Sequence, residues 1–374
     1  MNNKPLISIA IPTYNRAANL KNLLNCIALQ VKKLGGLVEI CISNNNSSDN
    51  TGEIVKSFQE KYPDLIKYNE NKENLGPDRN ILKVMEMSSG DFIWTFGDDD
   101  TIVENGINKV IEFLKKSPKE NTGLIVVRRE AYFIDKKTGK KIIYHNTLDK
   151  NRPGVFKIDK KYIIAGGFPD IGFLSALIWN NKIVKNIIKE EWATIEKGIE
   201  TANFHVPIYC TMFLKYPYID AIALNEKIIC SELPCYKYFI EDKFVFTYKY
   251  HKKLYSLLLS IKYMNDYYAS LIVKLDKGLK KMFIKDMIIL RTFESFNYFS
   301  YFGCLKLFFS CATFMDALLF SLVLSILFII PSAILRFMYK VLLIIRHGKN
   351  WKHWWQLAIN ISSRTTKGTR RQVE

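Results

Sequence analysis

Short apolar runs alternate with amphipathic segments throughout the first 130 residues of this 374-residue chain. The apolar runs predict β-strands at 6–11, 37–42, 65–68, 91–96 and 123–127. The segments between them carry apolar side chains at helical spacing and predict helices at 17–31, 51–60, 77–85 and 102–114. This alternation predicts an α/β fold, in which helices cover both faces of a mostly parallel sheet.

A second αβ portion follows a polar segment. Residues 135–161 are rich in Lys, Asp and Asn and indicate a hairpin or a mobile loop. Beyond this segment, the pattern predicts a second αβ portion. It consists of the segment 173–179, a helix near 206–214 and a strand at 219–224. The chain then turns helical and aromatic, and its character changes again after Gly303. We therefore expect a domain at 1–245, a helical extension at 246–302 and a separate region at 303–374.

The formal charge of +18 indicates an anionic partner: nucleic acid, an acidic lipid surface or a phosphorylated small molecule. From Arg336 onward, nine Lys or Arg stand against the single acid Glu374, with Trp351, Trp354 and Trp355 among them. Tryptophans beside basic residues suit an anionic membrane surface. A nucleic-acid site can show the same mixture, but the neighbouring apolar segment favours lipid, and we expect no nucleic-acid partner.

That apolar segment, 317–335, has no charged side chain over nineteen residues, close to the ~20 that cross a bilayer core as a helix. One crossing would separate a cytosolic nucleotide-binding domain from the basic tail, which the positive-inside rule also places in the cytosol. An interfacial or re-entrant hairpin of 305–315 and 317–345, bent at Pro331, avoids this conflict. We therefore expect association with the cytoplasmic face of the inner membrane, with a buried core helix as the alternative.

Cysteine spacing and the N-terminus bear on the compartment. The seven cysteines form no Cys-x-x-Cys pair and no zinc-type spacing with histidine, so we expect reduced thiols in a cytosolic protein. The first apolar run, 6–11, is too short for a signal peptide and lacks a small-residue cleavage pattern.

Polar side chains follow three of the predicted strands at the point where each strand ends, at 13–16, 44–46 and 98–100. Because ligands of open α/β sheets bind beyond the carboxyl ends of the strands, these three segments mark a candidate site. The triplet at 98–100 is three adjacent carboxylates, which repel one another unless a cation lies between them. An isolated acidic triplet indicates a solvated turn, but the other two segments favour a cation site.

Four segments in order, 8–16, 39–51, 74–80 and 97–100, resemble the family 2 glycosyltransferases. The resemblance covers about residues 5–130 well, weakens to about 240 and is absent beyond. It implies a GT-A fold with a nucleotide-sugar and metal part at 1–130 and an acceptor part at 160–245. It also implies sugar transfer from a nucleoside-diphosphate sugar in bacterial surface polysaccharide synthesis.

The resemblance implies roles for single residues. Two loops would hold the base and ribose of the donor, through Pro12, Thr13, Tyr14, Asn15, Arg16, Asn44 and Asn45. The family usually has an acid at position 44 or 45, whereas the amides here can donate or accept hydrogen bonds. A turn with a helix N-cap is the alternative reading of that loop. Arg79, behind a Gly-Pro turn, would reach a diphosphate or the acidic triplet, or else form a surface ion pair.

The resemblance further implies a Mg²⁺ or Mn²⁺ ion held by Asp98, Asp99 and Asp100. Such an ion bridges the diphosphate and neutralises charge as the nucleoside diphosphate leaves. Gly97 stands where the family begins its acidic motif, so we expect Asp100 or Asp99 to touch the metal and Asp98 to touch the ribose or sugar.

An inverting transferase also needs a base that takes the proton of the acceptor hydroxyl. Matching 206–214 to the family's helix puts His205 near that position, with Glu200 in reserve. A histidine titrates near neutral pH and can serve as this base, or it can be a packed core residue. The expected acceptor is a polyprenyl-diphosphate-linked glycan at the membrane. The alternatives are a catalytically silent nucleotide-sugar-binding protein and a sugar-phosphate nucleotidyltransferase, although the Gly-rich phosphate loop of the latter is missing.

Overall fold

The computed structural model describes most of the first 232 residues and two C-terminal helices. The described residues are 4–32, 34–116, 120–134, 141–146, 148, 152–159, 173–199, 204–232, 257, 261, 269, 314–330, 332–347 and 352. The chain divides into two compact units, the first being Met1–Glu232 with Ser256–Ile272 and the second Leu233–Tyr255 with Val273–Glu374. Glu200 and nearly all of the predicted helical extension lie outside the described residues.

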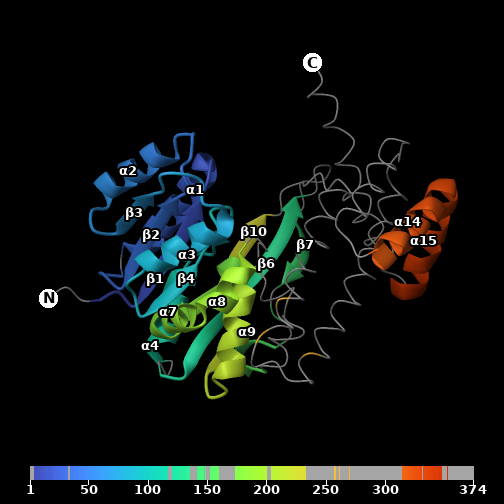
Figure 1. Cartoon of the computed structure of the whole chain (residues 1–374). Coiled ribbons are helices and arrows are strands. Elements are labelled where there is room, and N and C mark those ends of the chain that lie inside the picture. Colours follow the sequence, from blue (N-terminus) through green and yellow to red (C-terminus); the bar gives the residue numbers. More distant parts are fainter. Residues whose placement is uncertain are drawn as a thin grey trace. The chain divides into compact units, whose positions relative to one another are not determined.

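Four parallel strands form one half of a ten-stranded sheet, in the order β3-β2-β1-β4 (Figure 1). Their bounds are Ile7–Thr13 for β1, Val38–Asn44 for β2, Ile66–Glu70 for β3 and Phe92–Thr95 for β4. Every residue of β2 and β4 is buried, as expected for parallel strands that are covered on both faces. The predicted strands of this half are confirmed, and their carboxyl ends lie along one edge.

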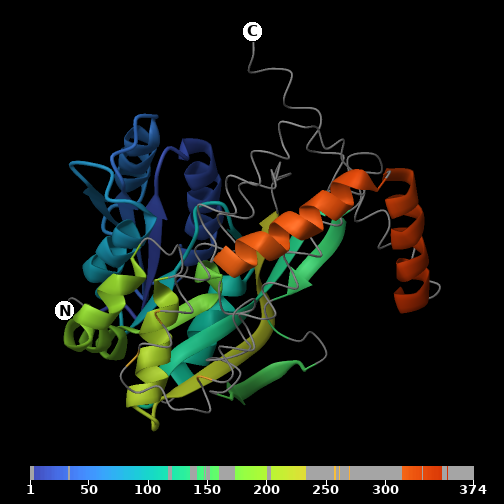
Figure 2. The ribbon, with the colours of Figure 1, turned by 45° about the vertical axis from the view of Figure 1, so that its right-hand side comes forward.

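The other half of the sheet mixes strand directions, which corrects the prediction of a mostly parallel sheet. Its strands are β5 Thr101–Ile102, β6 Thr122–Ile134, β7 Lys141–Asn146, β8 Gly154–Ile158, β9 Leu177–Asn180 and β10 Asp220–Glu232. β9 runs antiparallel between β4 and β6, and β10 runs parallel to β6 (Figure 2). β7 returns along β6 as an antiparallel partner, because a short connection cannot make a parallel crossover. This pair confirms a hairpin in the polar segment.

Helices cover both faces of the sheet. One face carries α1 Ala17–Val31, α2 Thr51–Lys61 and α4 Gly106–Lys116, whose apolar side chains join the core formed by Ile7, Ile9 and Ile11 of β1. The alternate residues of the strands face α3 Pro77–Met87, so that Ser43 of β2 contacts Asn80 of α3. The helices that follow β9 are α7 Asn181–Glu190, α8 Trp192–Ile195 and α9 His205–Lys215. The predicted helix near 206–214 is therefore confirmed.

A buried carboxylate, Glu39, lies near the amino-terminal end of β2, at the edge of the sheet opposite the carboxyl ends of the strands. Glu39 accepts hydrogen bonds from Ser8 and from the backbone N–H of Ser89 at 2.6 Å, and Lys67 lies 2.7 Å away. A Cβ at Gly90 would lie 2.8 Å from the backbone nitrogen of Ser8, so only glycine fits there. Burial alone would raise the pKa of Glu39, but Lys67 and the hydroxyl and backbone donors lower it below its ordinary value.

The second unit contains two described helices, α14 Phe314–Ile329 and α15 Ser332–His347 (Figure 1). Their boundary falls beside Pro331, where the sequence predicts a bend. The first arm of the predicted hairpin, 305–315, lies almost wholly outside the described residues. In the part of the chain that the structure describes, no helix has both the length and the apolar character needed to span a membrane.

Glu39→Gln should lower the free energy of unfolding by about 2 kcal/mol at pH 7, because it removes a charged acceptor from buried donors. The folded-state pKa of Glu39 is lowered, so its contribution is present above about pH 4.5 and is lost as pH falls through the folded pKa. Urea unfolding at pH 7 and at pH 3 measures this, and the difference from wild type should narrow at pH 3. Glu73→Gln, an exposed loop position, is the control; a difference that persists unchanged at pH 3 contradicts the assignment.

Candidate functional site

The loops after β1 and β2 are fastened together at the carboxyl edge of the sheet. The backbone N–H of Asn45 donates to the carbonyl of Thr13 at 2.9 Å, and that of Ser48 donates to Asn15 Oδ1 at 2.8 Å. Asn15 and Asn46 both adopt left-handed backbone conformations, with φ of 50° and 62°. Asparagine tolerates this region better than most residues, which explains its place at both turns. The two loops therefore form one rigid rim.

Asp98, the first member of the triplet, is held by the loop after β1. Thr13 Oγ1 donates to Asp98 Oδ2 at 2.8 Å, and Arg16 Nη1 donates to Asp98 Oδ1 at 3.0 Å. The side chain of Asp98 is only 6% exposed. Burial raises the pKa of Asp98 to about 6, against the lowering effects of the Thr13 hydrogen bond and the Arg16 charge. Both carboxylate oxygens of Asp98 are thus engaged by the protein.

Asp99 is the open member of the triplet. Its side chain is 44% exposed, and Arg16 Nη1 lies 2.8 Å from its Oδ2. Arg16 therefore lies between two carboxylates. Burial alone would lower the pKa of Arg16, but the charges of Asp98 and Asp99 and the hydrogen bonds to them raise it above its ordinary value.

Asp100 is buried among donors from distant parts of the chain. The hydroxyls of Ser175 and Ser231 donate to its two oxygens, and Arg129 Nε lies 3.8 Å from Oδ1. The Arg129 guanidinium lies over the ring of Phe173, 3.7 Å from its centroid. Burial raises the pKa of Asp100, opposed by Arg129 and the two serines. Arg129, Ser175 and Ser231 could not be identified from the sequence, because no local pattern links them to the triplet.

The three aspartates therefore differ, although the family resemblance implies one metal site for all of them. Asp98 and Asp100 already bond protein donors through both oxygens, which leaves Asp99 with the most open carboxylate. Within the described residues, no three His, Cys, Asp or Glu side chains converge on a ready metal site. Carboxylate oxygens are nevertheless the ligands that Mg²⁺ and Mn²⁺ favour, and Mg²⁺ commonly uses one or two of them with substrate phosphates. Asp98 and Asp99 already bind one cation between them, the Arg16 guanidinium. Their oxygens therefore fit Mg²⁺ or Mn²⁺ as ligands.

The amides predicted to read the base are engaged within the protein. Asn45 Nδ2 donates to Asn74 Oδ1 at 2.7 Å and to the Gly76 carbonyl at 3.3 Å. Its Oδ1 accepts from Asn71 Nδ2 at 3.0 Å and from the Leu75 N–H at 2.9 Å. The hydrogen-bonding capacity of Asn45 is thus used in holding the loop after β3.

Asn44 is used in a similar way. Asn44 Nδ2 donates to the Tyr68 hydroxyl at 2.9 Å, and its Oδ1 accepts from the Ser47 N–H at 3.1 Å. The side chain of Asn44 is buried. Base recognition by Asn45 would therefore require breaking bonds that position the rim, and recognition by Asn44 would require access to a buried side chain.

The remaining predicted residues lie as follows. Pro12 forms part of β1, and Tyr14 is 43% exposed on the rim. Arg79 is exposed in the first turn of α3, and no ion pair joins it to the triplet in the described structure. His205 is buried at the first residue of α9, edge-on to Phe204 at 6.0 Å between ring centroids. Met212, near the end of α9, packs on Gly123 at the start of β6, so His205 is at the far end of the helix from that contact.

Residues 8–173 match the family model described as "Glycosyl transferase family 2". This region is a family 2 glycosyltransferase domain. It contains the interlocked rim, the acidic triplet and Arg129, whereas Ser175 and Ser231 lie beyond it.

Two curated relatives are similar to the chain. Abequosyltransferase RfbV of Salmonella typhimurium is 28% identical over 75% of this chain and 80% of its own length. The GalNAc(5)-diNAcBac-PP-undecaprenol beta-1,3-glucosyltransferase of Campylobacter jejuni is 28% identical over 39% of this chain and 46% of its own length. The chain thus spans most of the first relative and under half of the second. Together with the family domain, these relatives place the chain among the transferases.

Two solved structures share the GT-A-like arrangement of the chain. S. aureus TarS 1-349 in complex with UDP-GlcNAc has a TM-score of 0.53 at 14% identity, over 98% of this chain and 91% of that one. The mannosyltransferase PcManGT of Pyrobaculum calidifontis, in complex with GDP-Man and Mn²⁺, has a TM-score of 0.50 at 10% identity, over 98% and 87%. At such low identity the likeness establishes the fold.

Asn45→Asp should lower the free energy of unfolding by about 2 kcal/mol, because a carboxylate oxygen would then face the oxygens of Asn74 and Gly76. Asn46→Asp is the matched control, since Asn46 is exposed on the same loop and aspartate also tolerates its φ. Thermal unfolding of both variants at pH 7 measures the effect. Equal stability of the two would show that the amide web does not hold the loop.

Proposed function

We propose that the protein transfers a sugar from a nucleoside-diphosphate sugar to a membrane-presented acceptor, with assistance from Mg²⁺ or Mn²⁺ and with inversion at the anomeric carbon. One observation carries this proposal: the open carboxylate of Asp99 and the guanidinium of Arg16 stand together at the rim formed by the loops after β1 and β2. A diphosphate is bound well by a divalent cation together with a basic side chain; Asp99 can be a ligand of the first, and Arg16 is the second.

The chain's own residues position the donor. Tyr14 offers an exposed ring on which a base can stack, and the fastened loops keep that ring in place. Asp98 and Asp99 face the diphosphate end, and Thr13 orients Asp98. When bound there, Mg²⁺ or Mn²⁺ would neutralise charge on the departing nucleoside diphosphate. The Mn²⁺ and GDP-Man of the mannosyltransferase and the UDP-GlcNAc of TarS are consistent with this donor chemistry.

His205 is the proposed base that accepts the acceptor's proton. It lies at the end of α9 away from the start of β6, which is the direction of the carboxyl edge. A neutral imidazole can take a hydroxyl proton near neutral pH, which suits direct displacement at the sugar. Glu200, outside the described residues, remains the reserve candidate.

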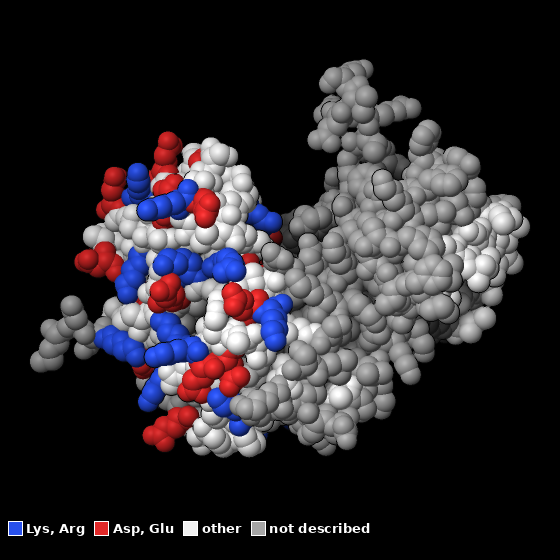
Figure 3. Space-filling view, in the orientation of Figure 1, with Lys and Arg blue, Asp and Glu red and all other residues white. Residues whose placement is uncertain are grey.

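The proposed acceptor is a polyprenyl-diphosphate-linked glycan, and the Campylobacter relative is named for an undecaprenol-linked glycan. The second unit provides a means of reaching such a lipid. The second unit, 233–255 with 273–374, carries 21 Lys or Arg against 7 Asp or Glu, whereas both signs are interspersed on the face of the first unit in Figure 3. Most of the chain's charge excess therefore belongs to the second unit.

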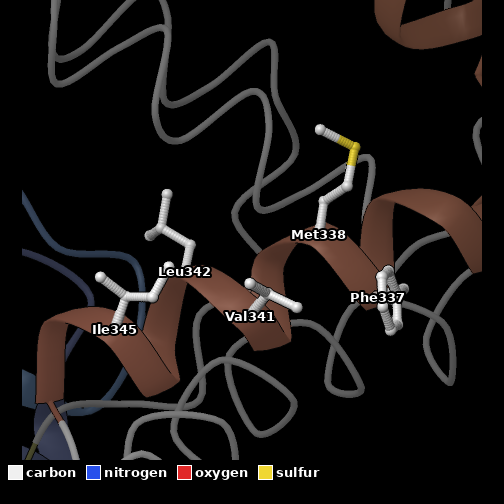
Figure 4. A pocket seen from close by; sticks show the side chains of 5 residues that line it. All are labelled: Phe337, Met338, Val341, Leu342 and Ile345. Atoms are coloured by element: carbon white, nitrogen blue, oxygen red, sulfur yellow. The ribbon is translucent and has the colours of Figure 1, made fainter.

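One face of α15 suits a lipid surface. Phe337, Met338, Val341, Leu342 and Ile345 line a shallow apolar pocket along it, and all five are exposed (Figure 4). Helical spacing places Arg336 and Lys340 on the opposite side. A basic amphipathic helix lies in the plane of an anionic bilayer. We therefore propose that α15 holds the enzyme at the cytoplasmic face of the membrane, close to its acceptor.

Asp99→Asn should abolish transfer and metal-dependent donor binding, whereas His205→Ala should bind donor as well as wild type but transfer at least about 100-fold more slowly. The assay screens UDP-, CDP-, dTDP- and GDP-sugars with Mn²⁺ and lipid-linked acceptor, scored by nucleotide release and by calorimetry. Glu73→Gln serves as an exposed control. Full sugar transfer by Asp99→Asn, or by the wild-type protein in excess EDTA, would contradict the metal-assisted mechanism.

Wild-type transfer rates in His205→Ala would remove His205 from the base role. If the wild-type protein binds a donor but transfers no sugar, it is a nucleotide-sugar-binding protein and not a transferase.

Leu342→Ser with Ile345→Ser should weaken binding to phosphatidylglycerol vesicles by at least about tenfold, because two apolar side chains no longer enter the lipid. The matched control is Leu29→Ser with Val155→Ser, two equally exposed apolar positions of the first unit. Vesicle sedimentation of the full chain measures both. Equal losses in the two double variants, or none in either, would argue against α15 as the membrane contact.

A further inference from the structure

The triplet has two basic partners, which are held very differently. Arg129 is buried, stacks on Phe173 and donates from Nε to Ser231 at 2.5 Å. Arg16 is 44% exposed, and its side-chain hydrogen bonds in the described structure go to Asp98 and Asp99 alone. A buried, stacked guanidinium is fixed in place, whereas a half-exposed one can leave its partners at small cost.

Arg16 also occupies the space between Asp98 and Asp99, where a divalent ion that bridged the two carboxylates would bind. A single nitrogen, Nη1, reaches Asp98 Oδ1 and Asp99 Oδ2 at 3.0 and 2.8 Å. An ion that bridged these two oxygens would lie a few ångströms from the positively charged guanidinium, and the two cations would repel each other. Asp100 is less accessible to an ion, since its side chain is only 12% exposed and Ser175 and Ser231 donate to its oxygens.

We propose that Arg16 is a resident counter-cation of Asp98 and Asp99, which leaves them when a divalent ion and a nucleoside diphosphate bind together. This inference rests on the proposed function. Before binding, Arg16 neutralises two adjacent carboxylates. After the exchange, the ion neutralises them, and the released guanidinium pairs with the diphosphate, for which its planar donor fork is well suited.

The exchange couples the two ligands. Without a nucleotide, a divalent ion has to displace Arg16, which then loses its anionic partners. With a diphosphate present, Arg16 gains a new anion as it leaves, so each ligand strengthens the binding of the other. The site thus resists a bare metal ion and accepts the ion together with its nucleotide.

The first experiment titrates the full-length protein with Mn²⁺ alone and follows free Mn²⁺ by electron paramagnetic resonance. Arg16→Ala should bind Mn²⁺ about tenfold more tightly than wild type, because one positive charge a few ångströms from the ion is gone. Lys21→Ala, which removes the same charge from an exposed position on α1, should match wild type. Wild-type or weaker Mn²⁺ affinity in Arg16→Ala would overturn the proposal, as would an equal gain in Lys21→Ala.

The second experiment repeats the titration with the nucleoside diphosphate, among UDP, CDP, dTDP and GDP, that binds wild type best. The tightening of Mn²⁺ binding by nucleotide should shrink at least about tenfold in Arg16→Ala, since Arg16 no longer links the ligands. An unchanged tightening would overturn the proposal. The variant Asp99→Asn distinguishes failure of the proposed function from failure of the Arg16 exchange. If Asp99→Asn weakens Mn²⁺ binding while Arg16→Ala has no effect, only the Arg16 exchange is contradicted. Absence of Mn²⁺ binding in every protein, with every nucleotide, would reject both.

Discussion

Three adjacent carboxylates at the end of one buried strand must each be compensated, and the architecture around β4 follows from this requirement. Neighbouring charges repel strongly where solvent is excluded, so uncompensated aspartates would unfold the turn or stay protonated. Compensation comes from two directions: Thr13 and Arg16 from the loop after β1, and Arg129, Ser175 and Ser231 from the other half of the sheet. The triplet therefore links the parallel half of the sheet to the mixed half through hydrogen bonds and ion pairs from both.

The sequence predicted the half of the fold in which local periodicity decides the structure. In β1 to β4 and their helices, apolar spacing sets both the element and its buried face, and most predicted ranges hold to within a few residues. The helix predicted at 102–114 is an exception, because Thr101–Ile102 form β5 and α4 begins at Gly106. The mixed half was missed because the antiparallel placement of β9 and the pairing of β5 with β10 join segments up to about 130 residues apart. The same limit applies to Asp100. Ser175 and Ser231, which donate to it, belong to no recognisable sequence motif, and only the tertiary fold brings them next to Asp100.

The asparagine-rich rim illustrates a different limit. A motif comparison aligns Asn44 and Asn45 with positions that usually carry an acid, and it suggests a substituted reading of the base. The contacts show that Asn45 bonds Asn74, Gly76, Asn71 and Leu75, and that Asn44 bonds Tyr68 and Ser47. Amides can do this without charge repulsion because each carries donors and acceptors together. The local composition of the loop was visible in the sequence, but the satisfaction of its hydrogen bonds was not.

The hydroxyls of Ser175 and Ser231 have a consequence for where the folding unit ends. The family match stops at residue 173, yet Asp100 needs a donor at 175 and another at 231. A fragment cut at the family boundary would strand a buried carboxylate beside a single arginine and would lose β9, which separates β4 from β6. Residues 8–173 are therefore not an autonomous folding module, and a chimera that exchanges the later part of this unit between relatives must supply compatible hydroxyls to Asp100.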